Sequence, residues 1–132
     1  MTYTDTIKVK VKSQKFSNIT GKVESIIRKS EVKNGICVLF SVGATSGLLI
    51  NEDDPMLLED LRNSLEKIAP EGHIYQHAVN ARSHIRSSMI GNSQTVPVKD
   101  GKMVLGTWQE IMVANFDTGE REREVVVSVV GE

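Results

Sequence analysis

Cysteine, proline and aromatic residues are scarce in this sequence, and each scarcity argues against a class of protein. A single cysteine, Cys37, allows no disulfide within the chain, which agrees with a reducing compartment. Three prolines and ten glycines form no low-complexity linker that would divide the 132 residues. Hydrophobic residues make up 39% and charged residues 25% of the chain, so we expect one folded domain over residues 1–132 with a core of its own.

An excess of one charge is also missing. The chain has 16 basic and 17 acidic residues, and a net charge of −1 gives no global field that would attract nucleic acid or a membrane surface. Residues 1–6 lack the basic and apolar regions of a signal peptide, and no apolar run approaches the length that a bilayer needs. We therefore expect a cytoplasmic protein without nucleic-acid or membrane partners.

The first part of the chain shows strand and helix periodicities in turn. Apolar residues alternate with lysines over residues 7–11, which predicts a strand with one apolar and one cationic face. Residues 19–27 carry apolar side chains at helical spacing, with Asn18 as the expected cap. Residues 36–42 predict a buried strand, and residues 48–50 continue as an extended segment. Cys37 lies within this apolar run, so we expect a buried and unreactive thiol.

Two further helices are predicted in the middle of the chain. Asp54 is a suitable cap, Pro55 suits the first helical position, and residues 58–68 carry an apolar stripe. A shorter helix is expected to begin after Asn80 as its cap and to end at Gly91. Helices therefore follow the first strands before a C-terminal part that is mostly β.

One hairpin is predicted around a dipeptide that favours two-residue turns. Strands at residues 94–98 and 102–105 flank Asp100 and Gly101, and Asp-Gly is a favoured turn sequence. Pro97 cannot donate a backbone hydrogen bond, so its strand is expected at a sheet edge or a bulge.

A second hairpin is predicted from strands at residues 110–116 and 122–130 around the turn at residues 117–119. The run 125–130 barely alternates, which predicts a strand that needs cover on both faces from helices, a second sheet or another subunit. The expected order is β-α-β-β-α-α followed by about four strands. This order indicates an α+β fold with mixed or antiparallel sheets and two to three helices.

The three histidines lie within twelve residues of one another. His73 and His77 are four residues apart, but they belong to a predicted loop, so this spacing does not place them on one face; solvated loop histidines are one interpretation and metal ligands the other. His84 lies one turn into the short helix, on the side of Ala81 and Ile85 that we expect to face inward. It is either a hydrogen-bonded core histidine or the partner of an anion at the helix N-terminus.

Other polar residues each have two interpretations. Arg82 and Arg86 lie roughly 160° from His84 on the helical wheel, so we expect them in solvent or at a subunit interface. Glu52 follows a buried run and could bind a metal, but acidic residues at this point also complement the dipole of the next helix. Trp108 fits a core or interface position or a surface on which a ligand stacks. Thr45, between glycines, offers a hydroxyl and turn N–H groups to an anion.

Several of these segments, taken in order, resemble the secondary thiamine-phosphate synthase (YjbQ-like) family. Residues 44–52 contain Ala-Thr-Ser-Gly-Leu and Ile-Asn-Glu, similar to the family's Thr-Thr-Ala-Gly-Leu and Ile-Asn-Glu. Residues 80–86 resemble its Asn-Ala-Asp-Ala-His-Ile-Lys/Arg helix, and residues 91–109 and 125–132 resemble its C-terminal half. The resemblance covers nearly the whole chain and is most specific over residues 87–109.

The resemblance implies a homotrimer, with sheets packed around a threefold axis and sites near subunit boundaries. It also implies a weak transferase activity that joins an aminopyrimidine methyl diphosphate to a thiazole phosphate and releases pyrophosphate. His84 and Glu52 are the candidate catalytic residues on this basis, and His77 with His84 are candidate ligands for a divalent metal such as zinc or magnesium. The candidate substrate-binding residues are Thr45, Asn51, Asn80, Ser88, Trp108 and Gln109.

Two positions depart from the family pattern. Gly43 stands where many members have His, and Arg82 stands where many have Asp. A metal or acid–base site that relied on those two groups would lack both. The alternative function is therefore a non-catalytic trimeric module that binds a metal or a phosphorylated metabolite.

Overall fold

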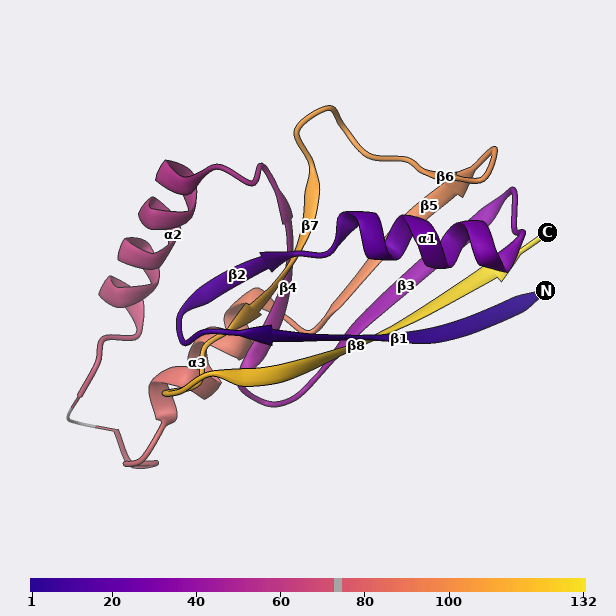
Figure 1. Ribbon diagram of the computed structural model, residues 1–132. Coiled ribbons are helices and arrows are strands. Elements are labelled where there is room, and N and C mark those ends of the chain that lie inside the picture. The colour runs from indigo at the N-terminus through magenta and orange to yellow at the C-terminus, as the bar shows by residue number, and fades with distance from the viewer. Residues whose placement is uncertain (73–74) are drawn as a thin grey trace.

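The computed structural model describes residues 1–72 and 75–132, and within these ranges it shows an α+β fold with three helices and eight strands (Figure 1). The strands are β1 (Thr2–Val11), β2 (Lys15–Asn18), β3 (Gly35–Val42), β4 (Ser46–Asn51), β5 (Ser93–Lys99), β6 (Lys102–Met103), β7 (Glu110–Asn115) and β8 (Arg121–Gly131). The helices are α1 (Thr20–Ser30), α2 (Pro55–Ile68) and α3 (Ala81–Ile90). None of them is both long and apolar enough to cross a membrane.

The strands form two antiparallel sheets. The large sheet has the order β1-β8-β3-β5-β6, and the small sheet has the order β2-β7-β4. Neighbours within each sheet are often distant in the sequence, because β8 lies between β1 and β3. The fold class expected from the sequence is confirmed.

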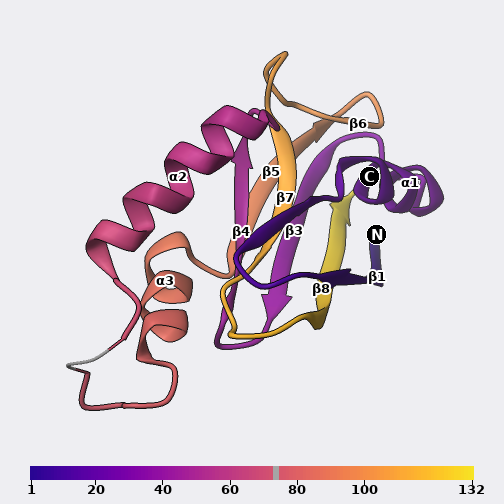
Figure 2. The same ribbon diagram turned by 60° about the vertical axis from the view of Figure 1, so that its left-hand side comes forward.

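One main core joins the two sheets and α1. It contains inward-facing residues of the large sheet, such as Leu39 and Val127, residues of the small sheet, such as Val113, and the apolar side of α1 with Val23 and Ile27. A second cluster around Phe116 packs α2 against the other face of the small sheet. Figure 2 shows α2 and α3 together on the side of the small sheet away from α1. The small sheet is therefore buried on both faces, which positions α3 against β4.

The outer face of the large sheet carries apolar side chains that are partly exposed. Ile36, Phe40 and Val42 of β3 are 43%, 48% and 47% exposed, and Val130 of β8 is 41% exposed. The register places Ile36 opposite Val130 and Phe40 opposite Val126, so these side chains belong to adjacent strands of one face. The run in β8 therefore alternates in burial within one chain, with its inner valines covered and its outer valines accessible.

Local turn and cap predictions agree with the structure. The carboxylate of Asp54 accepts a hydrogen bond from the backbone N–H of Leu57 (2.9 Å), and Pro55 opens α2. Asp100 and Gly101 have φ angles of 53° and 77°, the left-handed values that a two-residue hairpin turn requires, and they join β5 to β6. The position expected for Pro97 is wrong, because β5 lies between β3 and β6 and pairs regularly at this residue; the Pro97 carbonyl accepts from the N–H of Val104, just after the two-residue strand β6.

Two predicted elements need correction. The second hairpin is wrong, because β7 pairs with β2 and β4 in the small sheet, whereas β8 pairs with β1 and β3 in the large one. The turn at residues 117–119 therefore connects a strand of the small sheet to a strand of the large sheet. The same turn sequence suits a hairpin and a connection between sheets, and the pairing of β7 and β8 with distant strands decides which one forms. Strand β2 lacked an alternating pattern and was missed. Helix α1 begins one residue later than a cap at Asn18 implies, although the Asn18 side chain accepts a hydrogen bond from the N–H of Thr20.

Cys37 is expected to resist thiol reagents in the native protein. The residue has no exposed surface, and burial raises the pKa of its thiol to about 11, so only about one thiol in ten thousand is ionised at neutral pH. A colorimetric thiol assay should therefore show no reaction in the native protein and one thiol per chain in denaturant. Rapid labelling without denaturant would mean that β3 opens easily.

Candidate functional site

Helix α3 lies against β4 because the strand has a glycine where the two approach. A Cβ atom on Gly47 would lie 2.9 Å from a side-chain carbon of Ile90, closer than such contacts allow. The hydroxyl of Ser87 donates to the carbonyl of Ser46 (2.6 Å), and the N–H of Leu48 donates to the carbonyl of Gly91 (2.9 Å). These contacts hold the C-terminal half of α3 against the first residues of β4.

A group of three polar residues, which we call the histidine group, lies at the start of α3 and consists of His77, Asn80 and His84. The His84 Nδ1 atom is 3.2 Å from the carbonyl oxygen of Ala44, which can only accept, so Nδ1 carries the proton and Nε2 is the atom that can meet a ligand. The His77 Nε2 atom is 3.1 Å from the Asn80 side-chain oxygen, and the two imidazole centroids are 5.1 Å apart. A hollow of about 520 Å³ lies here, lined by Tyr75, Gln76, His77, Ala81, His84 and Ile85.

The first turn of α3 offers fewer N–H groups to an anion than the sequence suggests. Asn80 occupies the cap position, but its side chain does not bond to the helix backbone. The N–H of Ala81 donates to the carbonyl of His77, and those of Ser83 and His84 donate to the carbonyl of Asn80. An anion at this helix end would therefore depend more on the imidazoles than on the backbone.

The buried side chain of Arg123 supports the turn before β4, and no pattern in the sequence indicated this role. The Nη2 atom of Arg123 lies 2.9 Å from the Thr45 carbonyl, 2.7 Å from the Thr45 hydroxyl and 2.5 Å from the Asn115 side-chain oxygen. Burial lowers the pKa of Arg123 from its usual value. Burial also tends to raise the pKa of Asp117, but the N–H of Thr118 and the neighbouring Arg121 outweigh it and hold that pKa below its usual range. The Thr45 side chain is only 7% exposed, and its hydroxyl contacts Arg123 as part of the support of this turn.

Arg123 is also relevant to position 43, where this chain has glycine and the family pattern has histidine. Gly43 has a φ of 148°, a conformation that favours glycine, and a Cβ atom there would lie 3.0 Å from Nη1 of Arg123. A histidine at this position would require Arg123 to move. The glycine and the buried guanidinium are therefore compatible with each other, and the site is built without a side chain at position 43.

A second group, the carboxylate group, consists of Glu52, Asp53, Asp54 and Glu110. These side chains line a hollow of about 410 Å³ together with Asn18, Thr107 and Trp108. Trp108 is 71% exposed, so it is accessible to a ligand or another subunit rather than part of the core.

The other predicted residues near this hollow make local hydrogen bonds. The Asn51 side chain accepts from the N–H of Glu52, and the Gln109 side chain accepts from the N–H of Gly106. On α3, the Ser88 hydroxyl donates to the carbonyl of His84 one turn earlier.

The two groups lie at opposite ends of β4. Ala44, which contacts His84, precedes the strand, and Glu52 follows it. A six-residue strand is about 20 Å long, so one protomer does not bring His84 and Glu52 to the same ligand. The sequence singled out His77, Asn80, His84 and Glu52, but it indicated neither Glu110 nor the separation of the two groups.

The buried side of α3 differs from the expected one. Its buried residues are Ala81, Ser83, Arg86 and Ser87, and Arg86 is only 1% exposed. The prediction of a solvated Arg86 is therefore wrong. Its guanidinium lies 2.5 Å from the Glu66 carboxylate of α2, 2.9 Å from the Ala69 carbonyl and 2.9 Å from the Gln14 side-chain oxygen, which together offset the cost of burial. Ser83 and Ser87, two small residues four positions apart, were the only feature of the helix sequence that indicated this close-packed side.

Arg86 and Arg82 both contact Glu66. A hydrogen bond from the N–H of Glu71 and the two guanidinium groups hold the pKa of Glu66 below its usual range, although partial burial opposes this. Burial lowers the pKa of Arg86, and the Glu66 carboxylate counteracts that effect. The three residues fix α3 relative to α2.

The residues predicted as metal ligands do not form a complete site within one chain. His77 and His84 are neighbours, but within residues 1–72 and 75–132 no three His, Cys, Asp or Glu side chains are close enough to hold an ion together. His73 lies outside the described residues. One protomer thus presents two imidazoles, and a zinc site needs further ligands.

Comparison with known proteins agrees with this fold. The family model described as "UPF0047 protein YjbQ-like" matches residues 5–132. A UPF0047 protein of Methanocaldococcus jannaschii is 42% identical over 92% of this chain and 88% of its own length, and one of Methanothermobacter thermautotrophicus is 44% identical over 86% and 81%.

Solved structures show the same arrangement. A YbjQ-like protein of unknown function from Sulfolobus solfataricus matches with a TM-score of 0.90 and 30% identity over the full length of both chains. An uncharacterised YjbQ/UPF0047 protein from Clostridium acetobutylicum matches with a TM-score of 0.90 and 34% identity, over 96% of this chain and 99% of its own. Family, length and topology coincide over the whole domain, and this chain belongs to the YjbQ-like UPF0047 family.

Proposed function

We propose that the protein is a weak transferase of the thiamine-phosphate synthase type that works as a homotrimer in the cytoplasm. The observation that carries the proposal is the orientation of His84, whose Nδ1 atom is held by the Ala44 carbonyl so that Nε2 can meet a ligand in the adjacent hollow. The polar residues Asn51, Glu52, Asn80 and His84, on which the resemblance to the synthase rests, all lie on the surface or in hollows where a ligand can reach them.

The reaction needs charge stabilisation more than covalent catalysis. The bond between the pyrimidine methylene carbon and the diphosphate oxygen breaks, and its electron pair leaves with pyrophosphate. The lone pair of the thiazole nitrogen then forms the new C–N bond to the same carbon. A protein promotes these steps by stabilising the negative charge on the leaving group and by aligning the nitrogen.

His84 and Glu52 supply the two roles in this proposal. A protonated His84 would donate from Nε2 to a diphosphate oxygen, and His77 lies close enough to assist. Glu52 would orient the pyrimidine amino group, or help to hold a divalent cation together with the diphosphate. When bound, such a cation would neutralise part of the diphosphate charge.

A trimer would unite the two groups. In a cyclic assembly each subunit contacts its neighbours through two different surfaces, so the histidine group of one subunit can meet the carboxylate group of the next. The apolar outer face of the large sheet and the exposed Trp108 support such an assembly, because both offer apolar area to a neighbour.

The alternative is a trimeric module that binds a metal or a phosphorylated metabolite without catalysis. The edge-to-face contact of His77 and His84 favours it, since two adjacent imidazoles are a common start of a metal site. Thermal melting with divalent metals, thiazole phosphate and pyrophosphate, together with elemental analysis of protein purified without chelator, separates metabolite binding from metal binding. An assay of pyrophosphate release then decides between the transferase and the non-catalytic module.

Replacing His84 with Ala is expected to weaken pyrophosphate and thiazole phosphate binding by about 1–3 kcal/mol, the range of a charge-assisted hydrogen bond. The melting temperature should change little, because the ring borders a hollow rather than the core. Isothermal titration and thermal melting of the same samples measure both effects.

His77→Ala is the matched control, because its ring is adjacent but exposed, and among the described residues its side chain hydrogen-bonds to Asn80 alone. A smaller loss of binding is expected for this variant than for His84→Ala. A His84→Ala protein that melts far lower while binding both ligands normally would show that His84 is structural.

A further inference from the structure

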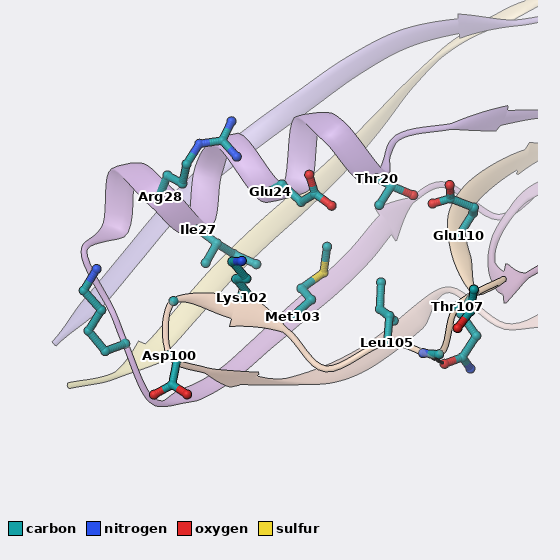
Figure 3. A pocket seen from close by; sticks show the side chains of 14 residues that line it. Thr20, Glu24, Ile27, Arg28, Asp100, Lys102, Met103, Leu105, Thr107 and Glu110 are labelled. Atoms are coloured by element: carbon teal, nitrogen blue, oxygen red, sulfur yellow. Dashed lines mark hydrogen bonds between the residues drawn. The ribbon is translucent and has the colours of Figure 1, made fainter.

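A further cavity lies away from the histidine group. It has a volume of about 630 Å³, within the range of small-molecule sites, and lies between α1 and the segment at residues 100–110 (Figure 3). It shares no lining residue with the hollow beside His84 and adjoins the carboxylate group through Thr107 and Glu110. The proposed transferase chemistry uses neither its basic residues nor its floor.

The walls of this cavity are joined at both ends. Near the end of α1, the N–H of Gly101 donates to the carbonyl of Lys33 (2.9 Å). Near its start, the N–H of Ile111 donates to the Thr20 hydroxyl (2.9 Å), and the N–H of Ile19 donates to the Ile111 carbonyl (2.8 Å). The helix is thus tied to the facing segment on either side of an open middle, so the cavity is formed before any ligand arrives.

Charges of opposite sign border the two ends. Figure 3 shows Arg28 and Lys102, together with Asp100, toward one end and Thr20 and Glu110 toward the other. Lys33, through its bond to the turn at residues 100–101, adds a third cation to the first end. Glu24 lies between the ends, with its carboxylate directed toward Thr20 and Glu110.

These charges are not used by the fold. In the described parts of the chain, the salt bridges do not include any of Glu24, Arg28, Lys33, Asp100, Lys102 or Glu110. Between the ends, Ile27, Met103 and Leu105 supply an apolar floor. The cavity therefore combines an oxyanion-binding end, an apolar middle and an end that accepts hydrogen bonds from a cation.

We propose that this cavity binds a small metabolite with a phosphate or carboxylate at one end and a protonated amine or amidine at the other. The oxyanion lies against Arg28, Lys33 and Lys102, where an arginine fork and two ammonium groups outweigh the one carboxylate. The amino group lies against Glu24 and Glu110, and the segment between them covers the apolar floor. A polyanion such as nucleic acid fits less well, because three acidic side chains border the same cavity.

The proposal can be tested on the full-length protein with simple bifunctional probes. A series of ω-aminoalkyl phosphates and a series of ω-amino carboxylic acids of increasing chain length are titrated at low millimolar concentration. Methyl NMR signals of Ile27, Met103 and Leu105 report binding at the floor. One chain length is expected to bind about tenfold more tightly than inorganic phosphate or an alkylamine alone, and the two series show whether phosphate or carboxylate is preferred.

Neighbouring residues of α1 provide matched variants. Arg28→Glu should weaken the best probe about tenfold, and Glu24→Lys should abolish the advantage of the amino group. Lys29→Glu makes the same charge change as Arg28→Glu, but Lys29 borders a different, shallow hollow. The affinity of the Lys29→Glu protein for the best probe should therefore stay within about twofold of that of the original protein. Equal losses in Arg28→Glu and Lys29→Glu would overturn the proposal, as would probes that bind no better than phosphate alone or that leave the three methyl signals unchanged. These outcomes do not depend on transferase activity, so they test the cavity separately.

Discussion

Replacing Arg86 with Leu is expected to lower the free energy of unfolding by about 3 kcal/mol, because it removes a buried charge from partners that stay in place. Arg86 is 1% exposed and bonds to Glu66 and the carbonyl of Ala69 at the end of α2 and to the side chain of Gln14 between β1 and β2. Without the guanidinium, the Ala69 carbonyl loses a donor inside the protein, and the partly exposed contact of Arg82 with Glu66 becomes the remaining ion pair between α3 and α2 in the described parts of the chain.

Arg82→Leu is the control, since Arg82 contacts the same Glu66 carboxylate but is more accessible and makes a longer contact of 3.2 Å. Its loss should stay below about 1 kcal/mol, as for a partly exposed ion pair. Urea unfolding at one fixed protein concentration measures both variants, and the slope should be unchanged if only stability is affected. Equal effects of the two substitutions would mean that the charge of Glu66, rather than the burial of Arg86, dominates this contact.

Replacing Phe40 with Asp is expected to convert the proposed trimer to monomers at micromolar concentration. Phe40 lies on the outer face of the large sheet next to Val126, among the apolar side chains that one protomer leaves partly exposed. If three such faces pack around an axis, the substitution buries three like charges without partners, and each desolvated carboxylate costs several kcal/mol. Native mass spectrometry or light scattering should give three times 14.6 kDa for the original protein and one chain for the variant.

Met56→Asp is the matched control for this experiment. Met56 is 75% exposed on α2, away from the large sheet, and the same change there should leave the assembly intact. A folded, monomeric original protein at micromolar concentration would exclude the trimer and with it the shared site. A trimer that tolerates Asp at position 40 would mean that a different surface forms the contact.

The candidate site was predictable where its members are near one another in the sequence. His77, Asn80 and His84 lie within eight residues, and the structure brings them together. Glu52 was predicted at the end of a strand and lies there, although the separation of the two groups depends on the course of β4.

The arginine that supports the turn before β4 could not be predicted in the same way. Arg123 contacts Thr45 across 78 positions of the sequence, and no pattern within either segment indicates the other.

The sequence alone predicts the α+β class and several local features, namely the cap at Asp54, the turn at Asp100 and Gly101, and the burial of Cys37. Each depends on interactions within a few residues or on the periodicity of one segment. Only the tertiary structure decided which sheet β7 and β8 join and which side of α3 is buried. These outcomes depend on contacts between distant segments: a strand pairs with the strands that bury it, and an arginine can be buried where acceptors from two other segments surround it.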